Sequence, residues 1–145
     1  LDAVLDHGDR FVLGIDLVKD PAVLLAAYDD PGGVTAEFNR NALRVLNRCL
    51  GSDFDPEAFE HVAIWDAQRS WIEMRLRARW DQEVTVPGIE VPLRLRAGDD
   101  LRTEISAKFT LEGMTTELSE AGFVVERSFV SVGEEFALVV ARPYC

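Results

Sequence analysis

Hydrophobic and polar residues alternate with a period of two through the middle of the chain, a pattern typical of strands with one buried face. Residues 61–80 form a predicted hairpin, whose second strand places these side chains on one apolar face: Ile72, Met74, Leu76, Ala78 and Trp80. Two further predicted strands, at 89–96 and 101–109, follow turns that contain glycine. The pattern therefore predicts an antiparallel meander.

The two ends of the chain have a different pattern. The near-continuous apolar run FVLGIDLV, residues 11–18, is typical of a strand in the centre of a parallel sheet. Asp20 and Pro21 are suited to begin a helix after it. Thr110 is suited to cap a later helix, and a hairpin is predicted over 123–143. This order indicates an α/β fold, the last part of a doubly wound sheet with a terminal antiparallel hairpin and an insertion.

A second helix is predicted from about Thr35 to Leu50, with Gly51 suited to its C-terminal cap. Its helically spaced apolar residues, which we expect to face the core, are Phe38, Ala42, Val45, Leu46 and Cys49. The acidic pair Asp29 and Asp30 lies between the two helices. A helix-end loop is favoured there over a ligand-binding loop.

The composition is that of one globular domain of ordinary size, with 145 residues, 48% of them hydrophobic and 28% charged. The net charge of -11 argues against nucleic acid and against an anionic membrane surface as partners. No apolar run has the length of a transmembrane helix. Two cysteines are too few for a disulfide framework, so a cytoplasmic location is expected.

Motifs that carry chemistry by themselves are absent from the sequence. There is no GxGxxG loop for a dinucleotide and no GxSxG turn for a nucleophile. His7 and His61 have no cysteine or carboxylate at ligand spacing, so no metal site is predicted. His61 is interpreted as a surface or packing residue of the hairpin. The remaining candidates lie on one helix end and two strands: Tyr28, Met74, Glu104 and Ser106.

The stretch RTEISAKF, residues 102–109, contains two of these candidates. Its alternation places four polar side chains on one strand face: Arg102, Glu104, Ser106 and Lys108. Spacing alone leaves open whether this face is solvated or whether Glu104 and Ser106 point into a pocket.

Several short motifs in a fixed order are more specific than these residues alone. They are DLVKD (16–20), AYDD (27–30), GVTAEFNRN (33–41), FEHVAIW (59–65), IEMRLRA (72–78) and TEISAKF (103–109). In this order the chain, from about residue 11 to residue 142, closely resembles the histidine-specific, S-adenosylmethionine-dependent Nα-methyltransferases of ergothioneine biosynthesis. The hairpin tip AQRSW matches no motif of that family, and Ala107 occupies one of its variable positions.

The resemblance implies the C-terminal part of a class I, Rossmann-like methyltransferase sheet with an inserted α+β substrate-binding domain that contains the antiparallel meander. It implies three segments: a late strand and helix of the methyltransferase domain (1–27), the substrate-binding insertion (28–107), and a return to the methyltransferase domain (108–145).

The family's glycine-rich loop lies upstream of the segment GIDLVKD, so S-adenosylmethionine is expected to be bound mainly by residues outside this chain. The start of the chain, which has no methionine, fits the same interpretation. We therefore expect the 145-residue chain alone to be inactive. We also expect its uncompleted sheet edge at 11–18 to favour self-association.

The activity implied by the resemblance is transfer of methyl groups from S-adenosylmethionine to the α-amine of L-histidine until the trimethylated product, hercynine, forms. Glu104 and Ser106 are implied to contact the imidazole, Tyr28 the region of the substrate carboxylate, and Met74 the apolar wall of the ring pocket. A carboxylate can accept from the ring N–H while a hydroxyl donates to the other ring nitrogen. These residues orient the substrate, and no catalytic residue, cofactor-binding residue or metal ligand is assigned within this chain.

Two alternatives stay open. One is an enzyme of the same family that acts on another aromatic amino acid, such as a tryptophan derivative, although an indole has no acceptor nitrogen for Ser106. The other is a non-catalytic ligand-binding or structural remnant. A glycine-rich loop encoded just upstream would distinguish an enzyme from such a remnant.

Overall fold

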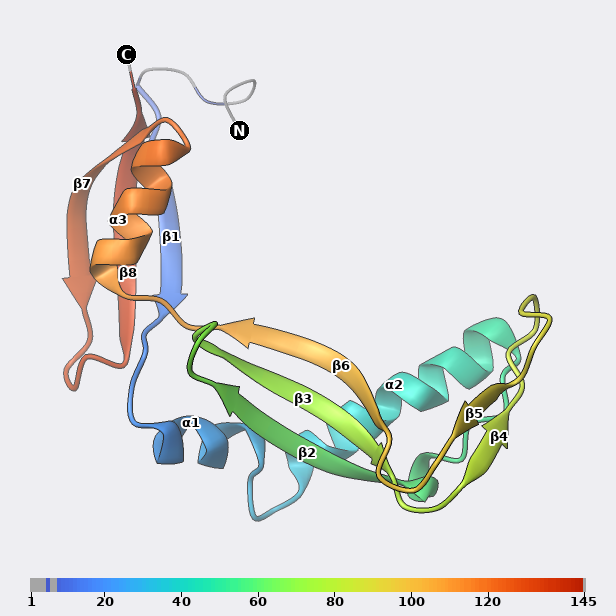
Figure 1. Ribbon diagram of the computed structural model, residues 1–145. Helices are drawn as coiled ribbons and strands as arrows, with labels where there is room; N and C mark the ends of the chain where they lie inside the picture. The colour runs from blue at the N-terminus through green and yellow to red at the C-terminus, as the bar shows by residue number, and fades with distance from the viewer. Residues whose placement is uncertain (1–4, 6–7, 145) are drawn as a thin grey trace. The chain divides into compact units, whose positions relative to one another are not determined.

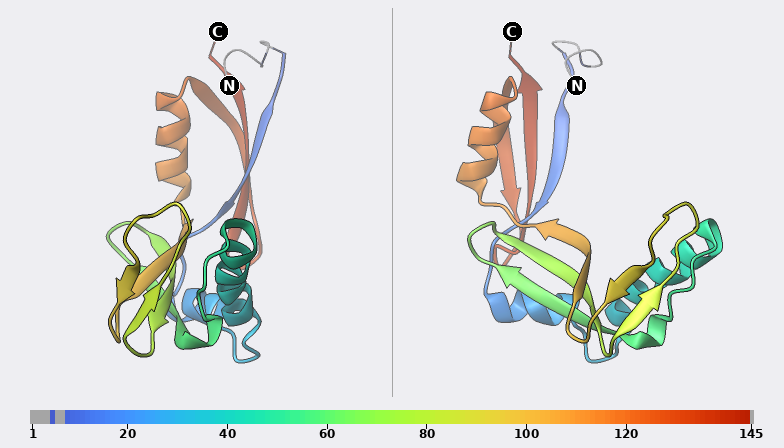
Figure 2. Two further views of the ribbon diagram at one scale, coloured as in Figure 1. Left: turned by 90° about the vertical axis from the view of Figure 1, so that its right-hand side faces the viewer. Right: turned by 45° about the vertical axis from the view of Figure 1, so that its right-hand side comes forward.

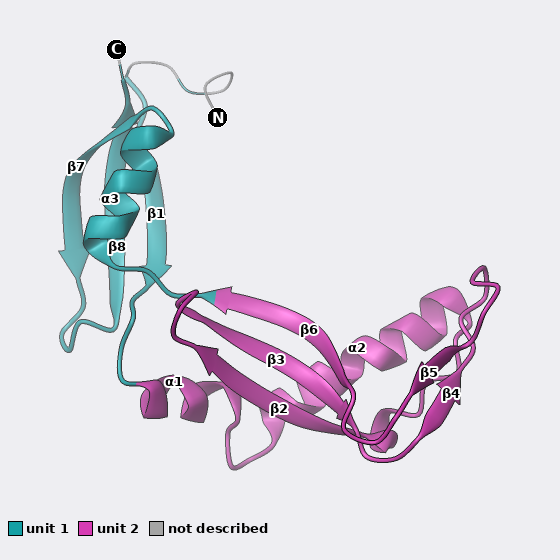
Figure 3. Ribbon diagram, in the orientation of Figure 1, with its two compact units in different colours: residues 1–20, 107–145 teal, residues 21–106 magenta. Residues whose placement is uncertain are grey.

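The computed structural model describes Leu5 and residues 8–144, so the prediction that concerns His7 lies outside the described residues. The chain divides into two compact units, one formed by Leu1–Asp20 with Ala107–Cys145 and the other by Pro21–Ser106 (Figure 3). The division into functional segments after residues 27 and 107 stays a prediction.

The first unit contains a three-stranded sheet with the order β1-β8-β7 (Figure 1). Its strands are β1 (Phe11–Asp16), β7 (Phe123–Val130) and β8 (Phe136–Pro143), and both β1 and β7 pair with β8 in antiparallel register. Among the described residues β1 is therefore an edge strand with an antiparallel neighbour, and the predicted position in the centre of a parallel sheet stays a prediction. A single parallel bridge, between Leu17 and Phe109, extends β1. An apolar run reports burial but does not identify its neighbours in the sheet.

Helix α3 (Leu111–Glu120) packs on one face of this sheet, as the left view of Figure 2 shows. Thr110 caps the helix, since its Oγ1 accepts from the Gly113 N–H at 3.0 Å, and Gly122 follows its end with φ 86°. The predicted cap at Thr110 is confirmed. The core between helix and sheet consists of Ile15, Leu17, Met114, Leu118, Phe123, Ala137, Val139 and Ala141.

The other face of the same sheet carries apolar side chains that no described residue buries. They are 44% to 59% exposed and come from all three strands: Val12, Phe129, Phe136 and Leu138. Gly14 lies on this face, and a Cβ there would be 2.9 Å from Cζ of Phe136, so the ring can lie across β1 because residue 14 is glycine. One sheet face is thus packed and the other is an open apolar surface.

The second unit is built around a three-stranded sheet with the order β2-β3-β6. Its strands are β2 (Phe59–Asp66), β3 (Trp71–Ala78) and β6 (Asp100–Ala107), with β2 and β3 paired in antiparallel register. The predicted hairpin is therefore confirmed. Its buried face contains four of the five predicted residues, whereas Trp80 lies beyond the end of β3 and is exposed.

The predicted single meander is wrong in one respect, because a separate two-stranded sheet lies between β3 and β6. It consists of β4 (Gln82–Val84) and β5 (Leu93–Leu95), and only three residues of the predicted strand 89–96 are extended. Pro87 and Pro92 interrupt this region, since proline lacks the N–H that a sheet ladder needs. The chain then returns to β3 as β6, which runs opposite to β3 in Figure 1.

Two helices, α1 (Pro21–Tyr28) and α2 (Val34–Leu50), precede these strands, and a short 3-10 turn (Pro56–Ala58) leads into β2. Gly51 caps α2 in the left-handed conformation, as predicted. The Asp30 carboxylate accepts from the backbone N–H groups of Val34 and Thr35, at 3.1 and 2.8 Å. The Thr35 N–H, followed by the Thr35 side chain and the Val34 N–H, lowers the pKa of Asp30 to about 2. Asp30 therefore serves the helix-end loop that the sequence favours.

The buried face of α2 is not the predicted one. Asn39 and Leu43 are its buried residues, whereas Phe38 is 66% exposed and Cys49 is exposed rather than part of the core. Leu43 joins the apolar core of the second unit, together with Phe54, Ala58, Phe59, Leu76, Ala78, Val84 and Leu95. The helix thus turns a polar residue inward and an apolar stripe outward.

Candidate functional site

All four candidate residues lie in the second unit. Tyr28 is the last residue of α1, Met74 lies on β3, and Glu104 and Ser106 lie on β6. The structure brings two of them together, because Tyr28 Oη and Ser106 Oγ are 2.7 Å apart and form a part-buried hydrogen bond. These residues belong to two different sequence motifs, so the fold joins the end of a helix to the end of an edge strand.

The main chain of Tyr28 is held as well. A helix leaves its last carbonyl groups without intrahelical partners. The Tyr28 carbonyl oxygen is 2.8 Å from Nε2 of His61, a buried residue of β2. Nδ1 of the same ring is 2.9 Å from Nδ2 of Asn39 on α2. His61 is therefore a packing residue, one of the two roles that the sequence suggests, and it connects three elements.

Strand β6 is fixed to β3 by a network of ion pairs. The Glu73 carboxylate, 4% exposed, accepts from Trp71, Arg75 and Arg102, and the Asp100 carboxylate accepts from Arg75 and Arg77. The hydrogen bond from Arg75 is the main cause that lowers the pKa of Glu73. The hydrogen bond from Arg77 does the same for Asp100. Both carboxylates are thus charged, and each accepts from an arginine on the other strand. These ion pairs fix the position of β6, the strand that carries Glu104 and Ser106.

Met74 is a buried residue of β3 and does not face solvent. Its side chain is 4% exposed, and its carbonyl oxygen accepts from Oγ1 of Thr103 at 2.9 Å. That bond places β6 next to Met74. The structure therefore shows Met74 as a buried residue of β3 beside the edge strand β6.

Glu104 is exposed and lines a hollow of about 230 Å³, called here the Glu104 hollow. The residues that line it come from α2 and β6: Phe38, Asn39, Asn41, Ala42, Thr103 and Glu104. Ligand pockets for larger molecules have volumes of roughly 300–1,000 Å³, so this hollow suits a small ring or side chain. Within the described residues the Glu104 carboxylate has no hydrogen-bond donor, so its acceptor sites face the hollow or solvent.

Lys108 corrects the prediction of one continuous polar strand face. Its side chain is fully buried in the first unit, with Nζ 3.0 Å from Oδ2 of Asp16. Lys19 Nζ is 2.6 Å from Oδ1 of the same carboxylate. Burial raises the pKa of Asp16, but the hydrogen bonds from Lys19 and Lys108 outweigh it, and the net pKa is lowered. Lys108 thus belongs to a charged cluster at the end of β1.

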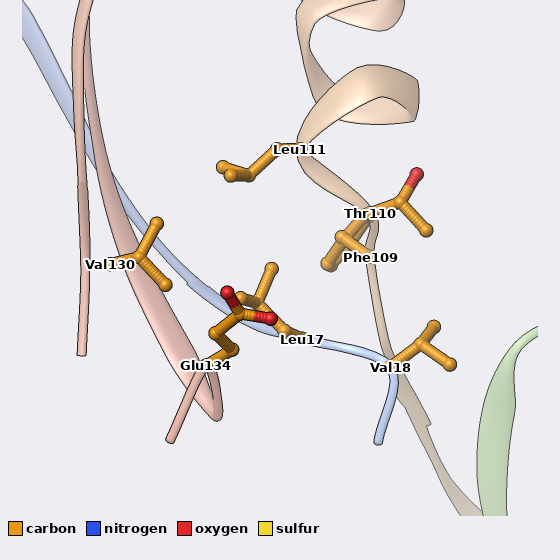
Figure 4. Close-up of a pocket in the computed structure, with 7 residues that line it drawn as sticks. All are labelled: Leu17, Val18, Phe109, Thr110, Leu111, Val130 and Glu134. Atoms are coloured by element: carbon orange, nitrogen blue, oxygen red, sulfur yellow. The ribbon is translucent and has the colours of Figure 1, made fainter. Parts of the chain in front are cut away.

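The described part of the first unit does not fit the methyl-donor cofactor expected from the resemblance. A hollow of about 240 Å³ lies there, lined by Leu17, Val18, Phe109, Thr110, Leu111, Val130 and Glu134. Figure 4 shows that the carboxylate of Glu134 is the one charged group among these side chains. A nucleoside sulfonium needs a longer cleft with several polar contacts. Neither this hollow nor the Glu104 hollow provides one.

Two further properties concern the described residues alone. No group of three or more histidine, cysteine, aspartate or glutamate side chains is placed to hold a metal ion among them. No helix in the same residues has both the length and the apolar character needed to cross a membrane.

Sequence reasoning missed two residues of this site. Asn39 and His61 both lie in motifs that carry the resemblance, GVTAEFNRN and FEHVAIW, but their spacing shows no pattern of a site. His61 contacts Asn39, which lies 22 positions away in the sequence, and Tyr28, which lies 33 positions away. Only membership of a motif could have indicated them.

Comparison with known proteins agrees with the motifs. Residues 1–143 match the family model described as histidine-specific methyltransferase, SAM-dependent. The histidine N-alpha-methyltransferase of Mycobacterium tuberculosis is 46% identical over 141 residues, which are 97% of this chain and 44% of that protein. The protein of the same name from Mycolicibacterium smegmatis is 47% identical over 137 residues, 94% of this chain and 43% of that protein.

A shorter match joins 33% of the chain to the ergothioneine biosynthesis protein 1 of Neurospora crassa, 42% identical over 48 residues and 6% of that protein. The chain spans less than half the length of the two bacterial relatives. The resemblance stated from the motifs is confirmed by these matches. The chain belongs to the family of histidine-specific, S-adenosylmethionine-dependent methyltransferases.

Proposed function

We propose that this chain is the substrate-recognition portion of an enzyme that trimethylates the α-amine of L-histidine to hercynine. The observation that carries the proposal is the 2.7 Å hydrogen bond between Tyr28 and Ser106. Glu104 precedes Ser106 by two residues on β6, and its carboxylate has no donor in the described residues. Each of these residues occupies its expected place in a family motif. The names of the two bacterial relatives support histidine as the substrate class.

The hydroxyl pair can rearrange to bind histidine. Tyr28 and Ser106 each carry one O–H group, and one of the two donates to the other. Histidine offers an acceptor ring nitrogen for the Ser106 O–H and a carboxylate for the Tyr28 O–H. Binding therefore opens the pair, and each hydroxyl then donates to the substrate. The ring N–H is left for the Glu104 carboxylate, so the substrate ring is held from two edges.

The residues of this chain orient the substrate rather than transfer protons. Their contacts lie at the imidazole and the carboxylate, whereas methyl transfer occurs at the α-amine. S-adenosylmethionine supplies the methyl group when it is bound. Placing the amine correctly is a large part of catalysis in such reactions, because no covalent enzyme intermediate is needed.

We further propose that residues outside this chain bind the cofactor and complete a Rossmann-like sheet. A doubly wound sheet has helices on both faces. In the first unit α3 covers one face, and the open apolar face with Val12, Phe129 and Leu138 is suited to receive the helices of the other side. Strand β1 has β8 as its one partner strand among the described residues, so a further strand can pair with its free edge. A cytoplasmic location and the absence of nucleic-acid or membrane partners remain part of this proposal.

The test is methylation by the whole protein, compared with the 145-residue chain. The whole protein should convert L-histidine, with S-adenosylmethionine, to a product that mass spectrometry shows to carry three methyl groups. The 145-residue chain should give none. Faster methylation of a tryptophan derivative than of histidine would assign another substrate within the family. Failure of the whole protein to methylate any amino acid would favour a non-catalytic remnant, and turnover by the 145-residue chain would contradict the cofactor assignment.

A further inference from the structure

His61 is a buried histidine whose two ring nitrogens both have partners, and the function proposed above does not use it. Nδ1 lies 2.9 Å from Nδ2 of Asn39, and Nε2 lies 2.8 Å from the carbonyl oxygen of Tyr28. The His61 side chain is on β2, between the end of α1 and the middle of α2. Buried polar groups that are this fully satisfied hold their neighbours in one arrangement.

The hydrogen bonds determine the tautomer of the ring. Nδ2 of Asn39 also donates to the carbonyl oxygen of Arg75 at 3.1 Å, which identifies that amide atom as the nitrogen. An amide nitrogen donates and cannot accept, so Nδ1 of His61 must accept. The ring proton is then on Nε2, where it donates to the Tyr28 carbonyl oxygen. A ring protonated at both nitrogens would set two donors against each other at Asn39.

Tyr28 is held at both ends as a result. Its carbonyl group, one of the four that α1 leaves without an intrahelical partner, is fixed by His61. Its hydroxyl group is fixed by Ser106. A shift of the Tyr28 main chain would move the hydroxyl away from the substrate carboxylate, and small displacements of positioning groups have large effects.

We propose that His61, with its tautomer set by Asn39, is a positioning residue for Tyr28 and through it for substrate binding. The inference rests on the function proposed above, because it assigns the contact between Tyr28 and the substrate. His61 touches neither the substrate nor the cofactor in this arrangement. The effect of His61 on substrate binding therefore requires the Tyr28 hydroxyl.

A double-mutant cycle in the whole enzyme tests this dependence. His61→Leu should raise the KM for histidine about threefold to tenfold, the range for one lost hydrogen bond, and should change kcat less. In the Tyr28→Phe background the same substitution should change KM less than about twofold, because no hydroxyl remains to be placed. His61→Gln should restore most of the affinity, since its amide can accept from Asn39 and donate to Tyr28.

Leu76→Ala is the matched control, because Leu76 is the buried cross-strand neighbour of His61 on β3. It should lower the unfolding temperature while its effect on KM stays the same with and without the Tyr28 hydroxyl. Equal KM effects of His61→Leu in both backgrounds, or a His61→Gln enzyme no better than His61→Leu, would overturn the inference.

The ring itself gives a readout that does not depend on turnover. Nitrogen NMR of the whole enzyme should show a neutral His61 with its proton on Nε2, and Asn39→Leu should disturb that signal. A proton on Nδ1, or on both nitrogens at neutral pH, would overturn the inference even if every variant at residue 61 failed to fold. Absence of histidine methylation by the wild-type enzyme would instead overturn the proposed function, and the NMR result would still decide this one.

Discussion

The sheets of the two units differ in which of their faces are covered and in how their strands are held together. In the first unit, α3 covers one face of β1-β8-β7, and the opposite face exposes apolar residues from all three strands. In the second unit, one face of β2-β3-β6 packs on an apolar core, and ion pairs around Glu73 and Asp100 join β3 to β6. The second unit thus uses ion pairs to hold its edge strand β6 against β3. The first unit has a surface suited to further protein.

Replacing apolar side chains on the open face of the first unit should have the largest effect of the changes considered, and the property affected is self-association. In the 145-residue chain, Phe129→Thr with Leu138→Thr removes two large side chains from that face while keeping residues that favour strands. If this face mediates self-association, the double variant should weaken it about a hundredfold or more, because each lost side chain contributes roughly 1.5–3 kcal/mol. Sedimentation over a range of concentrations measures the change.

The matched control lies in the second unit. Phe38→Thr with Val45→Thr removes two exposed apolar residues from α2, which should leave association nearly unchanged. A stronger effect of the α2 pair would place the adhesive surface on the second unit. A 145-residue chain that stays monomeric and binds no apolar dye would contradict the prediction altogether.

Glu104→Ala in the whole enzyme should have the next largest effect, a loss of affinity for histidine. It removes the proposed acceptor for the ring N–H, and a hydrogen bond to a charged group is worth about 1.5–3 kcal/mol, so apparent histidine affinity should fall about tenfold to a hundredfold. The rate at saturating histidine should fall less, since the reacting amine lies elsewhere on the substrate. Steady-state kinetics with histidine and with tryptophan or phenylalanine should also show weaker discrimination.

Glu60→Ala is the control for this prediction, because Glu60 is an exposed carboxylate on β2 of the same unit and does not line the Glu104 hollow. It should leave histidine affinity unchanged. Unchanged affinity and selectivity in the Glu104→Ala enzyme would identify Glu104 as a solvated strand residue.

Local patterns in the sequence predicted the parts of the fold that depend on neighbouring residues. The period of two predicted the hairpin of β2 and β3, and Thr110 and Gly51 marked helix ends through contacts within a few residues. The inward face of α2 could not be predicted. Asn39 is buried because its amide binds His61 and the carbonyl of Arg75, and partners so far away leave no periodic signal.

The site shows the same division between local and distant contacts. Motif resemblance indicated Tyr28, Glu104 and Ser106, but only the fold shows that the first and last of them share a hydrogen bond. Lys108 continues the polar alternation of β6 in sequence, yet it is buried against Asp16 after the strand ends. Alternation predicts a strand face only as far as the strand continues.

The ion pairs of the two units should differ in their contribution to stability. Asp100 is 17% exposed at its side chain and binds Arg75 and Arg77, so Asp100→Asn should lower the free energy of unfolding by about 1–2 kcal/mol. In the first unit Glu126, 31% exposed, binds Arg10 and Arg142, and Glu126→Gln should change it by less than about 0.5 kcal/mol. Denaturant unfolding of both variants measures the difference, and equal losses would mean that the network around β6 is no stronger than a surface pair.

The smallest expected effect concerns Asp30 and depends on pH. Hydrogen bonds at the start of α2 lower its pKa from the ordinary 3.8 to about 2, so the folded state binds the charged form more strongly than the unfolded state does. The stabilisation is therefore complete above pH 3.8 and is lost as the pH falls toward 2.

The unfolding temperatures of the wild type and Asp30→Ala should differ by a constant amount near neutral pH, and the difference should shrink through this acidic range. Asp29→Ala, which removes the adjacent exposed carboxylate, is the matched control. A difference for Asp30→Ala that persists unchanged at pH 2 would mean that the side chain stabilises α2 without its charge.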